Sequence, residues 1–553
     1  MFLRELTVKR GEATYTYLKV VESAREQGRI VQRTLVNLGN VGQWPPERLR
    51  ALVRELQRFL DDDHLPSAGV LTGVTIRDCR QLGPYLAASQ VWGALDLDGL
   101  LTRLWQDRRL DSRAVACAKA MVLTRLVAPC SKLAVWELVR RDIWIPGVDG
   151  TRLPLHAYYR TLDALHETKA ALEQAVHRRM THLFNRDVSL VFYDLTSCYF
   201  EGTACGKARH GYSREHRPDL LQIELGLLVD ADGLPIGHEV FDGNVKDVTT
   251  VLGTLDRLQH EFGVRRCVFV GDDGMASAEN LAELTRRGYE YITSVSLGKS
   301  KLGQRLLGEA PAPWMWPAQT PTLRLQPVGT ANGIRYVGSY NPERAAQARQ
   351  RRRRHLRACV EEMRALQAGP KPHGKQKTPA ELLTAADRLV RRHGCQALVQ
   401  VSLVEERLTW RVDGAALRVA HRLDGVLLLE TNGATLSDAE VAQGYRSLWR
   451  VEDAFRHLKD SLRLRPIRHW NEAHVLGHVF VCVLAYLLER VLEQTLAQAG
   501  VALTARAALA ELRTLMVAML DYEGITLRRR SELTPAQRRI LAALGLQEVP
   551  SIW

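Results

Sequence analysis

The sequence lacks the cysteine and histidine spacings of a zinc-binding module. Its nine cysteines are scattered and include no Cys-x-x-Cys pair, and no histidine pair has the matching spacing. This pattern indicates reduced thiols rather than a disulfide framework or a structural zinc site. A chain of 553 residues is nevertheless long enough for about three or four domains and a large apolar core.

Long apolar runs are also missing. The opening stretch, residues 2–17, is polar and alternating, which does not match a signal peptide. The longest apolar stretch, residues 478–492, is short for a membrane span and contains Glu489 and Arg490. No internal repeat with a period of 20 to 50 residues is detectable. We therefore expect a cytoplasmic protein.

Acidic residues are too few to balance the basic ones, so the formal charge is +14. Residues 344–392 hold fourteen Lys or Arg against four acids, a local excess of ten. Phosphate neutralisation by Lys and Arg drives sequence-independent binding to nucleic acids. A charge run can also be only a solvated helix face. The composition favours a nucleic-acid partner, and a solvated helix face remains the alternative.

The apolar patterning divides the chain into regions of different kind. Within residues 188–297, strand-like segments come first as a meander and later alternate with helices, which suits a mixed sheet of the RNase H type. The expected fold class is multi-domain α/β. We predict a β-plus-helix module (1–65), a helical domain (83–185), an RNase H-like core (188–297 and 437–475), a β-rich insertion with a basic helical arm (298–436) and a C-terminal helical region (476–553).

Two aspartates stand at the ends of apolar runs in the predicted core. Asp194 follows VSLVFY and Asp272 follows RCVFVG. A carboxylate that emerges from a buried strand is costly unless it meets a cation. The alternative is that each aspartate is a turn residue or a helix cap. Asp247, in GNVKDVTTVL, is predicted to be such a cap and not a metal ligand.

A third acid lies in YRSLWRVEDAFRHLK, residues 445–459. On one continuous α-helix, steps of seven residues place Tyr445, Glu452 and Lys459 on a single face. Two strand aspartates and a helix glutamate are what a phosphodiester enzyme with divalent metals requires. A solvated amphipathic helix would show the same spacing.

Together, the motifs YDLT, GDDGM and YRSLWRVEDAFRHLK resemble the DDE transposases of bacterial insertion sequences, in the subgroup with a Tyr, Arg, Glu, Lys signature. The resemblance extends to LRLRPIRHWNEAHVLGHVFVCVLAYLL and to the opening region that ends in LVNLGNVG. It departs from the pattern at Leu448, where the subgroup has arginine, so Arg456, at i+4 from Glu452, is the expected substitute. The second motif reads Asp272-Asp273-Gly274, and the alignment favours Asp272 over Asp273.

The resemblance implies an enzyme that binds the terminal inverted repeats of its element and cleaves the ends by metal-dependent hydrolysis. It then joins the 3′-hydroxyls to target DNA, by a cut-and-paste route. Partners would be double-stranded DNA and a second copy of the chain in a dimeric complex. Cofactors would be Mg²⁺ or Mn²⁺, two ions per site, and the location the bacterial cytoplasm at the nucleoid. The helical domain at 83–185 would bind the element ends.

The implied catalytic and metal-binding residues are Asp194, Asp272 and Glu452. Alternative functions are a structure-selective nuclease or resolvase on the same core, and a non-catalytic DNA-binding descendant of a transposase. Trp449 beside Leu448 is expected in the core rather than stacked on a base. The expected DNA contacts are Tyr445, Arg456, Lys459, Arg463, Arg351, Arg352, Arg353 and Arg354.

Overall fold

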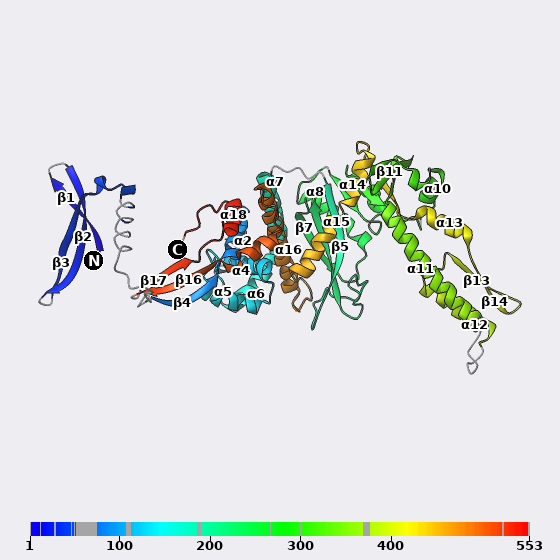
Figure 1. Ribbon diagram of the computed structural model, residues 1–553, viewed down its shortest axis with the longest axis horizontal. Helices are drawn as coiled ribbons and strands as arrows, with labels where there is room; N and C mark the ends of the chain where they lie inside the picture. The colour runs from blue at the N-terminus through cyan, green and yellow to red at the C-terminus, as the bar shows by residue number, and fades with distance from the viewer. Residues whose placement is uncertain are drawn as a thin grey trace. The chain divides into compact units, whose positions relative to one another are not determined.

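A computed structural model shows the chain as two compact units (Figure 1). One comprises Met1–Ile76 with Leu520–Thr526, and the other comprises Arg77–Met519 with Leu527–Trp553. The structure describes residues 2–10, 13–26, 29–45, 47, 48, 50, 53, 74–106, 112–184, 190–265, 267–298, 300–368, 377–522 and 525–550.

The first unit contains an antiparallel three-stranded sheet. Its strands are β1 (Phe2–Arg10), β2 (Ala13–Glu26) and β3 (Arg29–Asn40), in the order β1-β2-β3. Strand-type alternation and the turn around residues 27 and 28 predict this hairpin arrangement. A 3₁₀ turn, η1 (Val41–Gln43), follows and is capped by Asn40. The helix predicted at 46–62 lies mostly outside the described residues.

A mixed sheet forms the centre of the second unit. Strands β5 (Leu190–Tyr199), β6 (Gln222–Asp230) and β7 (Pro235–Asp242) are antiparallel neighbours. Strands β8 (Val268–Gly271) and β9 (Glu290–Ser294) continue the sheet on the other side of β5, parallel to it. This is the RNase H-type arrangement, and the predicted α/β fold class is confirmed.

Helices connect the later strands of this core. The 3₁₀ turn η4 (Asp247–Thr249) and helix α8 (Val251–His260) lead from β7 to β8. Helix α9 (Ala278–Arg286) leads from β8 to β9, with Ser277 as its N-cap. Such crossovers are what allow β8 and β9 to run parallel to β5.

Part of the predicted insertion extends this same sheet. Strands β10 (Ala318–Thr320), β11 (Leu323–Ala331), β12 (Ile334–Tyr340) and β15 (Val426–Thr431) complete a nine-stranded order, β10-β11-β12-β15-β9-β8-β5-β6-β7. Because β15 pairs with both β12 and β9, these strands do not form a separate β-sheet domain. Pairing between segments so distant in sequence is not visible in local periodicity.

The rest of the insertion has its own small core. After α10 (Lys301–Glu309) and η5 (Pro313–Met315), it contains long α11 (Pro342–Gln367), α12 (Pro379–Arg392), the hairpin β13 (Val399–Val404) and β14 (Arg407–Val412), and α13 (Gly414–Leu423). Figure 1 shows α11 leading away from the sheet toward α12 and this hairpin. Cys359, Met363, Val390 and Leu408 are buried where these elements pack together.

Helices occupy the region before the core. They are α2 (Gly83–Ala94), α3 (Leu97–Trp105), α4 (Ser112–Val127), α5 (Lys132–Arg141), α6 (Leu155–Glu167) and α7 (Lys169–Phe184), with the 3₁₀ turn η3 (Gly150–Arg152). Helix α16 (Glu472–Gln498) packs against α4, α6 and strand β7, and so joins this helical region to the sheet. It is long and apolar enough to cross a membrane, but 89% of its apolar window is buried inside the protein. Burial of this kind is that of a core helix.

The C-terminal region departs from the all-helical prediction. After α17 (Ala505–Glu511) and the 3₁₀ turn η7 (Leu512–Thr514), the chain continues as strands β16 (Met516–Tyr522) and β17 (Ile525–Arg530), before α18 (Pro535–Ala543). With β4 (Val74–Gln81) they form the order β17-β16-β4. The stretch LMVAML fits a helix or a strand, and pairing with β4 decides between them.

Candidate active site

Strand pairing brings Asp194 and Asp272 together. Strands β5 and β8 are parallel, with Val191 opposite Phe269 and Phe192 opposite Val270. Two more residues along each strand lead to Asp194 and Asp272. The two carboxylates, 78 positions apart in sequence, therefore lie level with each other on neighbouring strands.

The two aspartates repel each other in a partly buried setting. Burial, and then the charge of Asp272, raise the pKa of Asp194 to about 7. Burial also raises the pKa of Asp272, with Asp247 and Asp273 adding to the effect. Like charges and low dielectric both disfavour the ionised form. A cation between these carboxylates would relieve that cost.

The loop after β8 distinguishes Asp272 from its neighbour. Asp272 Oδ1 accepts a hydrogen bond from the backbone N–H of Gly274 (3.1 Å), whereas Asp273 is exposed. A side chain at position 274 would meet Asp272 Oδ1 at 3.2 Å and Asp247 Oδ2 at 3.5 Å. Glycine here therefore leaves room for the acidic groups. These contacts support the choice of Asp272.

Arg214 is a site residue that sequence patterning missed. Its guanidinium bridges Glu224 Oε2 and Asp247 Oδ2, each at 2.8 Å, and it also lowers the pKa of Asp194 against the effect of burial. The backbone N–H of Arg214 donates to Ser197 Oγ, which lies on β5 (3.0 Å). The available sequence signal for this site was Glu224, a charged residue inside the apolar run LQIELGLL. Glu224 is 2% exposed.

The prediction that Asp247 caps a helix is wrong. Lys246 occupies the N-cap position of η4, and Thr250 that of α8. The Asp247 carboxylate instead binds Arg214 and faces Asp272, because the turn is held by backbone bonds and leaves the side chain free to point into the acidic group.

The single helix predicted over residues 445–459 is three elements. Helix α14 (Asp438–Arg446) ends at Ser447, α15 (Trp449–Arg456) follows, and the π-helix η6 (His457–Ser461) carries Lys459. The break has a local cause, since Ser447 Oγ donates to the carbonyl of Gln443 and the next turn tightens to i→i+3 bonds. The seven-residue stripe of a straight α-helix therefore does not apply across this segment.

Glu452 nevertheless lies on a helix that packs on β5, the strand that carries Asp194. Helix α15 contacts β5 and β6, and its buried face is Val451, Ala454 and Phe455. Glu452 is exposed and lies beside this buried face on the helix.

Tyr445 connects Glu452 to the strand acids. Its side chain is half-buried, and burial raises the pKa of its phenol, with further contributions from Asp272, Asp273 and Glu452. The phenol is thus within electrostatic reach of both acid groups. Helix α14 is close to β9 at this point, because a side chain at Gly444 would meet Ile292 at 2.8 Å.

The donor set fits a divalent cation in part. Carboxylate oxygens suit Mg²⁺ and Mn²⁺, and the repulsion between Asp194 and Asp272 is what such an ion would remove. Among the described residues, no group of three or more Asp, Glu, His or Cys side chains is arranged to hold a metal ion. In the described residues, the three carboxylates Asp194, Asp272 and Glu452 are therefore not gathered around one point.

The expected phosphate-binding cations differ in how they are held. Lys459 forms an ion pair with Glu215, and both are nearly buried, at 11% and 12% side-chain exposure. Arg456 is exposed on the Glu452 face and pairs with Asp453. Arg463 is exposed and has a left-handed backbone conformation, φ 48°.

Two further expectations need correction. Trp449 is 53% exposed and lies against the Arg450 guanidinium at 5.5 Å, so it is not a core residue. Arg352 turns inward to pair with Asp424, because it lies on the face of α11 that packs toward α13 and β15. The other three arginines of that run, Arg351, Arg353 and Arg354, are exposed.

Two family models match the chain. A family model described as a transposase DDE domain matches residues 186–488, and the N-terminal domain of IS1634 family transposases matches residues 3–68. No curated protein matches the chain. A solved structure, the piggyBac transposase synaptic complex with hairpin DNA, is 9% identical over 80% of this chain and 81% of that chain, with a TM-score of 0.38.

Proposed function

This chain belongs to the DDE transposases, DNA-cleaving and strand-transferring enzymes of insertion sequences, and we propose that Asp194, Asp272 and Glu452 are its catalytic carboxylates. The observation that carries this assignment is the parallel register of β5 and β8, which aligns Asp194 with Asp272. Helix α15 packs against β5 and supplies Glu452.

Enzymes of this family generally depend on a divalent metal. Asp194 and Asp272 would hold Mg²⁺ or Mn²⁺ between them, with two ions per site, and Glu452 would complete the ligand set. The metal supplies activation of a water or 3′-hydroxyl and stabilisation of the leaving oxygen.

The surrounding residues of the chain position the DNA. Tyr445, between Glu452 and Asp272, donates its phenolic hydrogen to a phosphate oxygen at the site. Arg456, on the exposed face of α15, attracts the phosphates of the same DNA strand. Lys459, which is paired with Glu215, adds positive charge beside that strand. Arg214 holds Glu224 and Asp247 in place, and its charge partly opposes the burial and the Asp272 charge that raise the pKa of Asp194.

The proposed substrate is double-stranded DNA, with the terminal inverted repeats of the element as the first partner and target DNA as the second. The helical region of α2 to α7 binds the ends, and Arg351, Arg353 and Arg354 on α11 add phosphate contacts. Two copies of the chain pair the two ends. The enzyme acts by a cut-and-paste route in the bacterial cytoplasm, at the nucleoid.

The test uses a duplex taken from the DNA that flanks the coding region. Asp194→Ala, Asp272→Ala and Glu452→Ala are each expected to abolish cleavage, since each removes a charge-bearing oxygen donor. Binding of the duplex, measured by gel shift, is expected to persist. Retained cleavage in any of the three variants would overturn the assignment of that residue.

A further inference from the structure

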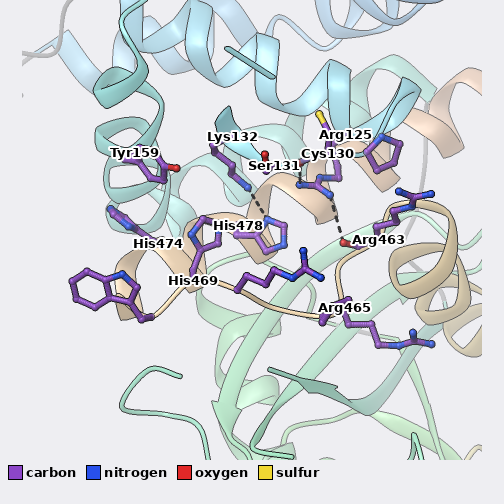
Figure 2. Close-up of a pocket in the computed structure, with 14 residues that line it drawn as sticks. Arg125, Cys130, Ser131, Lys132, Tyr159, Arg463, Arg465, His469, His474 and His478 are labelled. Carbon is purple, nitrogen blue, oxygen red and sulfur yellow. Dashed lines mark hydrogen bonds between the residues drawn. The ribbon is translucent and has the colours of Figure 1, made fainter. Parts of the chain in front are cut away.

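A basic cavity lies between the start of helix α5 and the segment that follows the Glu452 helix (Figure 2). Its volume is about 680 Å³, within the ~300–1,000 Å³ typical of ligand pockets. None of the described residues that line it is Asp or Glu. We call this the basic cavity, and its charged and titratable walls include Arg125, Lys132, Arg463, Arg465, Arg468 and His478.

Lys132 is a buried cation without an acidic partner among the described residues. Its relative exposure is 3%, and its Nζ lies 2.8 Å from His478 Nδ1. Figure 2 shows the two side chains facing each other. Burial, and then the charge of Arg125, lower the pKa of Lys132 to about 7. An anion in the cavity would restore the favourable setting for the ammonium form.

Arg125 is also buried, at 6% exposure, and its hydrogen bonds to the described residues all go to backbone carbonyls. Its guanidinium donates to the carbonyls of Cys130 (2.9 Å), Leu462 (3.3 Å) and Arg463 (3.4 Å). These bonds hold the backbone around Arg463, whose positive φ is costly for a residue that is not glycine. The cavity wall is thus held in a fixed, strained conformation with the Arg463 side chain exposed.

Two other cations of the wall are already neutralised. Arg465 pairs with Glu215 and Asp460, and Arg468 pairs with Glu201. Arg125, Lys132 and Arg463 have no such partner among the residues that the structure describes. This uncompensated charge, rather than the total number of cations, indicates an anionic ligand.

Two helices begin at the cavity. Helix α5 starts at Lys132 with Ser131 as its N-cap, and α16 starts at Glu472 with Asn471 as its N-cap. The cavity wall includes Ser131 and Lys132 of the first and His474 of the second. Helix N-termini favour anions, because their free N–H groups and dipoles are positive.

The basic cavity is tied to the catalytic strand. Ile467 bridges to Phe200, and its backbone N–H donates to the carbonyl of Tyr199 at the end of β5 (3.0 Å). Asp194 is five residues earlier on β5, a separation of about 17 Å at ~3.3 Å per residue. A stacked DNA strand covers that distance in about five nucleotides, at ~3.4 Å each.

We propose that the basic cavity binds a backbone phosphate of the DNA strand that leaves the catalytic carboxylates along β5, about five nucleotides from the cut. This rests on the proposed function, because the cut position is set by Asp194 and Asp272. Lys132, Arg125 and Arg463 contact the phosphate, and the starts of α5 and α16 contribute their N-terminal dipoles.

The first test measures inorganic phosphate binding by the full chain. Thermal unfolding is compared in phosphate and in chloride at equal ionic strength, for the unchanged protein, Lys132→Met, Arg463→Asn and Arg506→Ala. Met keeps the length of the lysine side chain, Asn tolerates a positive φ, and Arg506 is an exposed arginine of α17 outside the cavity. We expect phosphate to raise the melting temperature less in both cavity variants than in the unchanged protein and Arg506→Ala. Equal increases in all four proteins would overturn the proposal.

The second test locates the phosphate on DNA. In the flanking duplex, single phosphates are replaced one at a time by neutral methylphosphonates, and binding is measured with the same proteins. We expect one or two positions, about four to seven nucleotides from the cut, where the replacement weakens DNA binding by the unchanged protein. At these positions it should not weaken binding by Lys132→Met or Arg463→Asn. No such position would overturn the DNA assignment. Failure of the proposed function is distinguishable, because it would abolish specific binding of the duplex and leave the phosphate result intact.

Should Lys132→Met fold poorly, as judged by near-UV circular dichroism, Arg463→Asn decides the question alone, since Arg463 is exposed.

Discussion

Two regions along strand β5 carry uncompensated charge of opposite sign: the acidic end, around Asp194, and the basic end, beyond Tyr199. Around Asp194, carboxylates are close together without a cation between the two strand aspartates. Beyond Tyr199, cations line the basic cavity, and no described residue of its wall is acidic. Where a protein leaves one sign of charge uncompensated, a ligand of the other sign is expected. The comparison supports the proposals that a metal binds at the acidic end and a DNA phosphate at the basic end.

Charge removal at the acidic end should have the largest effect. Asp194→Asn is expected to lower the cleavage rate by roughly 10⁴-fold, on the scale of catalytic-residue knockouts, and to raise the melting temperature of the metal-free protein. The second effect follows because the variant removes the repulsion with Asp272. A cleavage assay measures the rate and a thermal scan measures the melting temperature. A lower melting temperature in Asp194→Asn would contradict repulsion between Asp194 and Asp272.

Loss of the nearly buried ion pair between Lys459 and Glu215 should have the next largest effect, and this effect is on stability. Glu215→Gln is expected to cost about 3 kcal/mol of unfolding free energy, because Lys459 loses its acidic partner while nearly buried. Lys459→Met should cost less, because Glu215 keeps its ion pair with Arg465. The double variant should cost less than the sum of the single variants. Urea denaturation of the unchanged protein, the two single variants and the double variant measures the coupling energy between Lys459 and Glu215. Additive losses of unfolding free energy would show that the pair does not contribute to stability.

The basic end should show a pH dependence of stability. A lysine whose pKa is lowered to about 7 in the fold binds fewer protons than in the unfolded chain, where its pKa is about 10.4. Unfolding free energy should therefore rise with pH between these values, by up to about 1.4 kcal/mol per unit. Denaturation of the unchanged protein and Lys132→Met at pH 7 to 9 measures it. If unfolding free energy changes with pH equally in the two proteins, the pKa of Lys132 is not lowered in the fold.

The smallest expected effect compares neighbouring arginines on α11. Arg351→Ala should leave stability unchanged and reduce the salt dependence of DNA binding by about 0.9 in the log–log slope, as one phosphate contact is lost. Arg352→Ala should instead lower stability, because the buried Asp424 loses its closer partner and keeps only Arg349 at 3.7 Å. Identical behaviour of the two variants would contradict the inward placement of Arg352.

The acidic end could be predicted well from sequence. Apolar runs that end in Asp194 and Asp272 indicate buried parallel strands, and neighbouring parallel strands bring such residues level. Arg214 was not predictable, because it lies in an irregular segment between β5 and β6 where no periodicity operates. Its pairing with Glu224 and Asp247 exists only after the sheet has formed.

The helix of Glu452 shows the limit of periodicity. Residues 445–459 fit one amphipathic helix, and the break at Ser447 and the π-helical turn at Lys459 leave no trace in that pattern. The basic cavity has a similar origin. Its cations come from positions more than 300 residues apart, Arg125 and Arg463, and only the packing of α16 against the helical region brings them together.

Manganese binding by the full-length protein tests the central claim most directly. Electron paramagnetic resonance can count free and bound Mn²⁺ for the unchanged protein, Asp194→Asn, Asp272→Asn and the matched control Asp273→Asn. The assignment predicts that Asp194→Asn and Asp272→Asn each lose the bound ion while Asp273→Asn retains it. Undiminished Mn²⁺ binding in Asp194→Asn and Asp272→Asn, or its loss in Asp273→Asn alone, would contradict a metal site between β5 and β8.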